Sequence, residues 1–257
     1  MNARFKYKSK MKGAKRTKKN KKKKKHRQKK KSQKASIKKM EFNPTQPNLM
    51  PITKKYISEI SNGQYTCATY EAGGGGDCLY WTVASGIEMA RGVPKVKEHR
   101  KFTMQDMRNI VGDEITKWSD EKFKEFIEIC KVSQKYGEWC DKWNPAYVPN
   151  QNILSKIYKI KGNIHWGTDL DISILSRKLN VGIIVIQFGR MYCIPVDEKT
   201  EKKKKKYYML IYNNGGHYQL MGVKNKKMNK YHSIFLHQDI PKFLKDEYLK
   251  VCKRPLV

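Results

Sequence analysis

The chain has 257 residues, enough for one sizeable domain with appendages or for two small domains. Its 56 Lys and Arg residues against 23 Asp and Glu give a formal net charge of +33, but 21 of the bases and no acid lie in the first 40 residues. Since no apolar run approaches the roughly 20 residues of a membrane span, and none follows the basic start, we expect neither a transmembrane segment nor a secretion signal.

Residues 1–40 form a polybasic tail with too few apolar side chains, and too much like charge, to offset the entropy of ordering. We expect this tail to be disordered when free. We favour contact with nucleic acid or another polyanion, or an address to the nucleus or nucleolus, over a purely solubilising role. No aromatic interleaving or RNA-reading motif accompanies the charge, so no base-specific recognition is expected.

Beyond the tail, the prolines of residues 41–62 indicate a linker that leads into a globular region. Apolar spacing, capping residues and flanking glycines predict helices at Cys78–Met89, Phe102–Ile115, Glu121–Lys131 and Asp169–Leu179. Runs of β-branched and aromatic residues predict strands at Val181–Gln187, Met191–Val196, Tyr207–Tyr212 and His217–Val223, the last after a turn at Asn213–Gly216. Helices early and strands late predict an α+β fold.

The six cysteines show neither the density of a small secreted disulfide scaffold nor a Cys-x-x-Cys pair of the kind that binds zinc or exchanges electrons. We therefore expect them to be reduced thiols in an intracellular compartment. The remaining question is whether one of them is a nucleophile.

Cys78 is the strongest candidate, because the glycine run Gly73–Gly76 and Asp77 deliver it to the first turn of a predicted helix. The partial positive charge at a helix N-terminus favours a thiolate and would lower the pKa of Cys78. The same glycines can aim backbone N–H groups at the oxyanion of an acyl-transfer intermediate. The alternative is a small buried cysteine after a tight turn.

A cysteine nucleophile needs a base, and His217 is the best placed of the six histidines. It follows a Gly-Gly turn and opens a strand, which can hold an imidazole rigidly at a sheet edge. An exposed turn histidine is the alternative, and the pairing with Cys78 favours the catalytic interpretation.

Three ordered segments resemble the blocks of the OTU (ovarian-tumour) cysteine proteases: Gly74–Tyr80, His165–Ile186 and Gly215–Tyr218. The Gly-Gly-Gly-Asp-Cys form particularly resembles OTU domains of large DNA viruses. The resemblance covers roughly Tyr65 to His237. It assigns residues 63–237 to an OTU-like domain and leaves residues 238–257 as a C-terminal helical extension.

This resemblance implies a papain-like α+β fold, a small central sheet flanked by helices, and hydrolysis of the isopeptide bond after the C-terminal glycine of ubiquitin or a ubiquitin-like protein. The host cytoplasm or nucleus would be the location, and no metal or cofactor is implied. Carried over, Cys78 is the nucleophile and His217 the general base. The loop Gly74, Gly75, Gly76 and Asp77, with the Cys78 N–H, is the oxyanion site. Trp166, with Gly167, packs the active-site helix and borders the substrate channel, and Tyr218 lies beside that channel.

Two positions depart from the family pattern. Gly75 stands where many members have Asp three residues before the cysteine, and Gln219 where most have Asp or Asn two residues after the histidine. Gln219 can orient His217 through its amide oxygen, or it is only a strand residue that faces solvent or substrate. Asn213, Asn214 and Asp77 are the other candidates for that role. The alternative for the whole chain is a polyanion-binding basic protein whose OTU-like domain is an inactive scaffold.

Overall fold

The computed structural model divides the chain into two units, Met1–Lys39 and Met40–Val257. It describes residues 42, 44, 49–92, 101–137, 141–195 and 205–256, all of them in the second unit. The predicted disordered tail lies outside the described residues, as do residues 41, 43 and 45–48 of the predicted linker. The rest of the predicted linker is described, and its segment Pro51–Ile60 forms a helix. Over the described ranges, no helix is both long and apolar enough to cross a membrane.

A mixed β-sheet lies at the centre of the second unit, in the strand order β1-β5-β4-β2-β3 with β6 paired to β4. The strands span β1 Tyr65–Tyr70, β2 Val181–Gln187, β3 Arg190–Tyr192, β4 Tyr207–Asn213, β5 Tyr218–Asn225 and β6 Ile234–Phe235. β2 and β4 run parallel, whereas the other pairs are antiparallel. In the β1–β5 pair Tyr70 faces Leu220, so the residues that follow and precede them, Glu71 and Gln219, come to the same end of the sheet.

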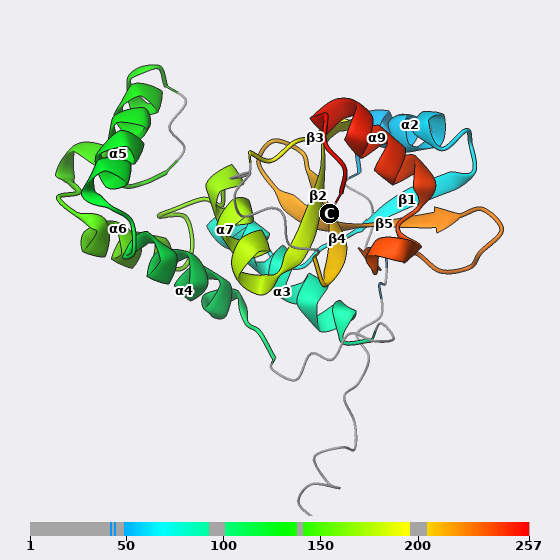
Figure 1. Ribbon diagram of the computed structural model, residues 1–257, viewed down its shortest axis with the longest axis horizontal. Coiled ribbons are helices and arrows are strands. Elements are labelled where there is room, and N and C mark those ends of the chain that lie inside the picture. The colour runs from blue at the N-terminus through cyan, green and yellow to red at the C-terminus, as the bar shows by residue number, and fades with distance from the viewer. Residues whose placement is uncertain are drawn as a thin grey trace, which may run out of the picture. The chain divides into compact units, whose positions relative to one another are not determined.

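Helices cover both faces of this sheet (Figure 1). Helices α3 Cys78–Ala90 and α7 Asp169–Leu179 pack on one face, and α2 Pro51–Ile60 and α9 Lys242–Cys252 pack on the other. The remaining helices of the described residues are α4 Met104–Ile115, α5 Asp120–Lys135 and α6 Gln151–Lys159. Short 3₁₀ turns lie at Gly75–Asp77, Pro145–Tyr147 and His237–Asp239.

Strand β4 shows how the two apolar layers arise, because every one of its residues is buried. Alternate side chains of a strand point to opposite faces. Tyr207, Met209 and Ile211 join the core beneath α3 and α7, whereas the intervening Tyr208, Leu210 and Tyr212 join the core beneath α2 and α9. A strand that is covered on both faces has apolar residues at successive positions, which explains the continuous apolar run in this segment.

The α+β prediction is confirmed, and several elements match closely. Helix α7 and strand β2 have the predicted bounds, α3 extends one residue further, and α4 begins two residues later than predicted, at Met104. Ser119 caps α5, its side chain accepting the Lys122 N–H. Strand β3 is shorter than predicted and ends at Tyr192.

Among the described residues, two helices and two strands were not predicted: α2, α6, β1 and β6. Strand β1 is the consequential one, since the helices-before-strands pattern left no early strand. It lies at the edge of the sheet, beside a strand more than 140 residues further along the chain, so local pattern gives no sign of its partner. The end of β1 delivers a residue to the candidate active site, as described below.

The expectation that all cysteines are reduced is wrong for one pair. Cys193, just after β3, and Cys252, at the end of α9, form a disulfide with their Cα atoms 5.5 Å apart. Cys67, Cys78 and Cys130 are free and buried. The disulfide fastens the C-terminal helix to the strand at the edge of the sheet, a pairing that spacing along the chain could not show.

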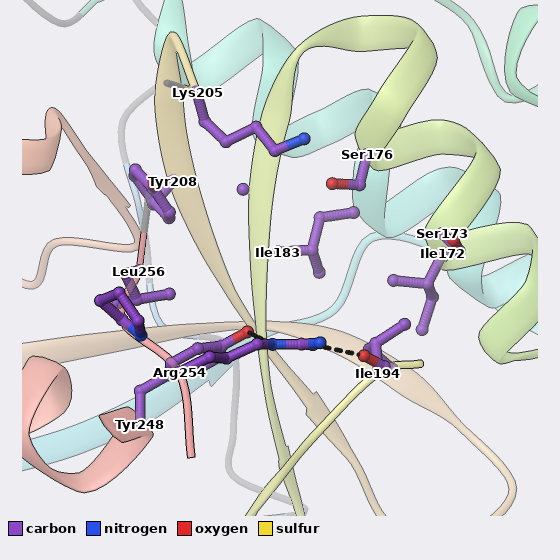
Figure 2. Close-up of a pocket in the computed structure, with 12 residues that line it drawn as sticks. Ile172, Ser173, Ser176, Ile183, Ile194, Lys205, Tyr208, Tyr248, Arg254 and Leu256 are labelled. Atoms are coloured by element: carbon purple, nitrogen blue, oxygen red, sulfur yellow. Dashed lines mark hydrogen bonds between the residues drawn. The ribbon is translucent and has the colours of Figure 1, made fainter. Parts of the chain in front are cut away.

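A small cavity of about 40 Å³ lies between α7, the sheet and the C-terminal segment (Figure 2). Arg254 closes one side by donating from its guanidinium to the Ile194 carbonyl at 2.7 Å. Neither Cys78 nor His217 lines this cavity, so it is separate from the candidate active site.

Candidate active site

Cys78 lies at the first residue of α3 with its side chain almost fully buried. The backbone N–H of Tyr218, the first residue of β5, donates to the Cys78 Sγ at 3.4 Å. One turn further along α3, the Thr82 hydroxyl donates to the Tyr218 carbonyl at 3.0 Å. These two contacts fix the start of the helix against the start of the strand, so His217, next to Tyr218 in the chain, comes to the end of α3 that carries the thiol.

The predicted low pKa of Cys78 is not what the structure supports. Burial raises the pKa of this thiol, and the hydrogen bond from the Tyr218 N–H and the nearby backbone N–H groups offset that effect only in part. The negative charge of Glu71 also raises it. The thiol therefore needs a base to remove its proton before it can attack a carbonyl carbon.

His217 has a partner that the sequence did not suggest, Glu71. Its Nε2 lies 2.7 Å from Glu71 Oε2, immediately beyond strand β1. An N–H on Nε2 that donates to this carboxylate leaves Nδ1 unprotonated, free to act as the base. Burial alone would raise the pKa of Glu71, but hydrogen bonds from His217, Gln219 and the Gly73 N–H bring it below its ordinary value. The carboxylate is thus ionised at neutral pH, as the stabilisation of an imidazolium requires.

Gln219 reaches His217 only through this carboxylate. Its Nε2 donates to Glu71 Oε2 at 2.7 Å, so Gln219 positions the glutamate and makes no bond to the imidazole itself. The side chain is buried, which corrects the alternative of a strand residue that faces solvent.

The other candidates for orienting His217 have different partners. Asn213 Oδ1 accepts the Gly215 N–H at 2.8 Å, and Asn214 Oδ1 accepts the Gly216 N–H at 3.2 Å. Both asparagines therefore shape the turn that precedes His217, in the manner of side chains that cap tight turns.

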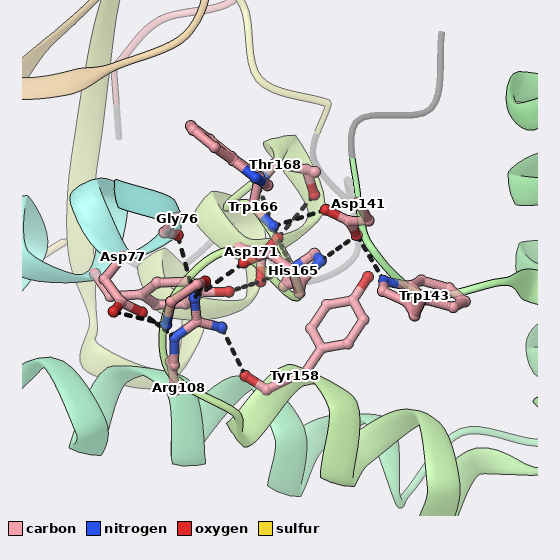
Figure 3. A network of polar contacts seen from close by, with 12 residues as sticks. Gly76, Asp77, Arg108, Asp141, Trp143, Tyr158, His165, Trp166, Thr168 and Asp171 are labelled. Carbon is pink, nitrogen blue, oxygen red and sulfur yellow. Dashed lines mark hydrogen bonds and ion pairs between the residues drawn. The ribbon is translucent and has the colours of Figure 1, made fainter. Parts of the chain in front are cut away.

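Asp77 does not orient His217 either, because a buried arginine binds its carboxylate (Figure 3). Arg108 of α4 is fully buried and its Nε donates to Asp77 Oδ1 at 2.5 Å. The other Asp77 oxygen accepts the Gly162 N–H at 2.8 Å. Asp77 is thus a structural anchor of the glycine loop, and the hypothesis that it is catalytic is corrected.

Arg108 ties the glycine loop to the segment that precedes α7. Its guanidinium donates to the carbonyls of Gly76, Tyr158, Gly162 and His165 at 2.9 to 3.2 Å (Figure 3). A buried charge with this many acceptors is satisfied, whereas loss of one partner would leave it costly to bury. These contacts fix the backbone of the glycine loop that precedes Cys78.

His165 belongs to the same buried network and not to the catalytic group. Its Nδ1 lies 2.6 Å from Asp141 Oδ2, and its Nε2 lies 3.2 Å from Asp171. Burial alone would lower the pKa of His165, but the two carboxylates raise it to about 9, so the imidazole is charged at neutral pH. Asp171 also accepts the Tyr80 hydroxyl at 2.7 Å, which connects the network to α3.

The glycine loop differs from the oxyanion site that the resemblance implied. Gly74 and Gly75 are exposed, and Gly75 has a left-handed φ of 66° that favours glycine. However, the Gly76 N–H donates to Asn163 Oδ1 at 2.7 Å, and the Cys78 N–H donates to the Gly75 carbonyl. These two expected donors are therefore occupied by the protein itself.

In the block around Trp166, Gly167 contacts helix α3, whereas the place of Trp166 beside a substrate channel stays a prediction. A Cβ on Gly167 would lie 2.4 Å from the Leu79 side chain, so only glycine lets this segment approach the active-site helix. The Trp166 N–H donates to Asp141 Oδ1 at 2.7 Å, which fixes the backbone at this point. Tyr218 is buried beside Cys78. Among the described residues, no cluster of His, Cys, Asp or Glu is suited to a metal ion.

A family model described as OTU-like cysteine protease matches residues 73–218, more than half of the chain. The chain belongs to this OTU-like cysteine protease family. The matched segment runs from the glycine loop through Cys78 to His217 and Tyr218, so the fold is the α+β OTU fold. Glu71 and Gln219 lie just outside it.

Solved OTU domains resemble the chain at low identity. An OTU domain in complex with ubiquitin is 16% identical, with 74% of this chain and 84% of that chain covered and a TM-score of 0.39. An OTU deubiquitinase from Wolbachia pipientis wMel is 16% identical, with coverages of 63% and 90% and a TM-score of 0.38. The viral OTU protease of Dera Ghazi Khan virus is 14% identical, with coverages of 74% and 100% and a TM-score of 0.33. A comparison with curated proteins finds no match.

Proposed function

We propose that the chain is a thiol-dependent deubiquitinase, which hydrolyses the isopeptide bond after the C-terminal glycine of ubiquitin or a ubiquitin-like protein. The observation that carries this proposal is the arrangement of three side chains. A buried thiol starts α3 against the start of β5, and the histidine that precedes this strand is bonded at 2.7 Å to the carboxylate that follows β1. A nucleophile, a base and an orienting group are the parts that acyl transfer by a cysteine requires.

In the first half of the reaction, His217 Nδ1 takes the proton from the Cys78 thiol as the sulfur attacks the glycine carbonyl carbon. Glu71 holds the imidazole ring and stabilises the imidazolium that forms. The tetrahedral intermediate collapses when the imidazolium gives its proton to the lysine amine, which leaves. A thioester then links Cys78 to the ubiquitin glycine.

In the second half, His217 takes a proton from a water molecule, whose oxygen attacks the thioester carbonyl. The intermediate expels the Cys78 thiolate, and the C-terminus of ubiquitin leaves as a carboxylic acid that gives its proton to water. The thiolate regains a proton from the imidazolium, which restores the starting state.

Ubiquitin is proposed as the substrate because the chain belongs to the OTU-like family and resembles two structures bound to ubiquitin. One of them is described as an OTU domain and the other as an OTU deubiquitinase. The glycine-rich motif before Cys78 carries the proposed likeness to OTU domains of large DNA viruses, which stays a prediction. Linkage preference follows from surfaces that contact the second ubiquitin, so it is a separate question from the chemistry.

The proposal is tested by incubating the full chain with diubiquitins of each linkage and with ubiquitin fused to a ubiquitin-like protein, and measuring free ubiquitin over time. Cleavage that depends on Cys78 supports the deubiquitinase. If no linkage and no fusion is cleaved while the folded chain binds ubiquitin, the inactive-scaffold alternative is correct.

A second proposed function belongs to residues 1–40, whose 21 bases and absence of acids favour binding to nucleic acid or another polyanion. Deleting them should leave turnover of a small ubiquitin-amide substrate within about twofold, yet weaken binding to RNA or DNA by roughly 100-fold at 50 mM salt. Fluorescence anisotropy at several salt concentrations measures the binding.

A tail with the same residues in scrambled order is the matched control for this deletion. It should restore binding, since charge and not sequence is proposed to act. A large fall in turnover of the small substrate on deletion would instead show that the tail belongs to the active site.

A further inference from the structure

The peptide bond between Gly75 and Gly76 has both of its polar groups engaged within the protein. Peptides in the described residues are trans, so the N–H and C=O of one peptide point in opposite directions. The Gly76 N–H donates to Asn163 Oδ1 at 2.7 Å, and on the other side the Gly75 oxygen accepts the N–H of Cys78. Because a backbone N–H can only donate, the oxygen of the Asn163 amide must face it.

This orientation is unfavourable for acyl transfer by Cys78. A tetrahedral intermediate needs N–H donors at the position where its oxygen becomes negative. Here the Gly75 oxygen occupies the Cys78 N–H and would repel a developing anion, while the Gly76 N–H points the other way, to Asn163. Turning this single peptide by about 180° would bring the Gly76 N–H to the same side as a released Cys78 N–H.

The surroundings allow this peptide to turn while holding its neighbours. Gly75 is exposed and has no side chain to obstruct the rotation, and Gly76 has none either. The next peptide is fixed, because the Gly76 carbonyl accepts from Arg108 at 3.1 Å and the Asp77 carboxylate is bonded to Arg108 and to the Gly162 N–H. Rotation is therefore confined to the peptide whose N–H Asn163 holds.

We propose that Asn163 is a positioning residue that holds the Gly75–Gly76 peptide in its closed orientation, and that substrate exchanges this contact for the bonds of an oxyanion site. The inference rests on the proposed hydrolase function. Asn163 has no part in the chemical steps and acts only through the peptide. The side chain is exposed, so replacing it does not open a cavity in the core.

The test measures kcat and KM for hydrolysis of ubiquitin carrying a C-terminal aminocoumarin amide. Asn163→Ala removes the acceptor and should raise kcat by about threefold to tenfold with little change in KM, because one net hydrogen bond no longer favours the closed state. Asn163→Asp keeps an acceptor and should stay at or below the wild-type kcat. Lys161→Ala, an exposed position two residues earlier on the same segment, is the matched control and should leave kcat unchanged.

Alkylation of Cys78 by iodoacetamide separates the possible failures, since displacement of iodide needs no oxyanion site. Its rate should be the same in wild type and Asn163→Ala. If wild type hydrolyses the substrate but Asn163→Ala has an unchanged or lower kcat, the positioning role of Asn163 is overturned and the hydrolase stands. If every variant is alkylated at Cys78 and none hydrolyses the substrate, the proposed function fails and this inference fails with it.

Discussion

Cys78→Ala and Cys78→Ser are expected to abolish ubiquitin-amide hydrolysis, with a loss of at least roughly 1000-fold, while the melting temperature changes little. In the proposed reaction the sulfur of Cys78 forms the thioester, and alanine or serine nearly matches the size of this residue in the buried site. His217→Ala should lose almost as much, and Cys78→Ala with His217→Ala no more than either alone, because the two groups act in one step. Fluorescence assays measure the hydrolysis rates, and circular dichroism measures the melting temperatures.

Cys67 and Cys130 supply matched controls, since both are buried free thiols whose pKa burial raises to about 12. Cys67→Ser and Cys130→Ser should keep turnover near that of the wild type, provided the variants fold. Retained activity in Cys78→Ala, or its loss in one of these controls alone at unchanged melting temperature, would place the nucleophile elsewhere.

Glu71→Ala is expected to lower kcat by roughly 100-fold, about 2.7 kcal/mol of transition-state stabilisation. The substitution removes the carboxylate that is 2.7 Å from His217 Nε2, so the ring loses both its fixed tautomer and the charge that stabilises the imidazolium. Glu71→Gln should lose less, about tenfold, because its amide oxygen can still accept the Nε2 hydrogen but carries no charge. Steady-state kinetics across pH 5 to 9 measure both.

The pH dependence of kcat separates an orienting role of Glu71 from a purely structural role, because a structural role would leave that dependence unchanged. Because the pKa of Glu71 is lowered in the folded protein, its carboxylate stays ionised at neutral pH and its contribution is lost only as pH falls through that lowered value. Glu71→Gln should therefore change the acid limb of the wild-type profile. Gln219→Ala, which removes one bond to the carboxylate, should fall between wild type and Glu71→Ala. Full activity in Glu71→Ala would dismiss the orienting role.

Cys78 and His217 could be predicted from sequence because each carries a strong local signal. A glycine run followed by a helix fixes the position of the cysteine, and a Gly-Gly turn before a strand fixes that of the histidine. In the structure the Tyr218 N–H donates to the Cys78 Sγ, which places the residue that follows His217 against the start of α3. Local conformation and spacing were sufficient for this part of the site.

Glu71 could not be predicted, because its role depends on strand pairing between distant segments. The sequence does show an acid two residues before the glycine run, yet nothing local indicates that β1 lies beside β5. Only that register brings Glu71 to the end of the sheet where His217 and Gln219 lie. Reasoning from sequence proximity to His217 named Gln219 first and Asn213, Asn214 and Asp77 as the other candidates. Of these, Gln219 bonds to Glu71, and the two asparagines bond within the turn.

The pKa of Cys78 and the state of the glycine loop were missed for a different reason. The charge of a helix N-terminus is a local effect, whereas the burial that outweighs it depends on packing by α3, β5 and their neighbours. The occupied N–H of Gly76 likewise depends on Asn163, 87 residues further along the chain. The burial of Cys78 and the contact between Gly76 and Asn163 both arise from tertiary packing, which sequence reasoning about the local helix and loop does not include.

The most direct measurement of the central claim is the reaction of the full chain with ubiquitin whose C-terminus carries an electrophile, followed by mass spectrometry of the intact protein and its peptides. We expect a single ubiquitin to add covalently, with the modified peptide containing Cys78, and we expect no adduct in Cys78→Ala. An adduct at Cys67 or Cys130, or a folded wild-type chain that forms no adduct with ubiquitin, would contradict the account.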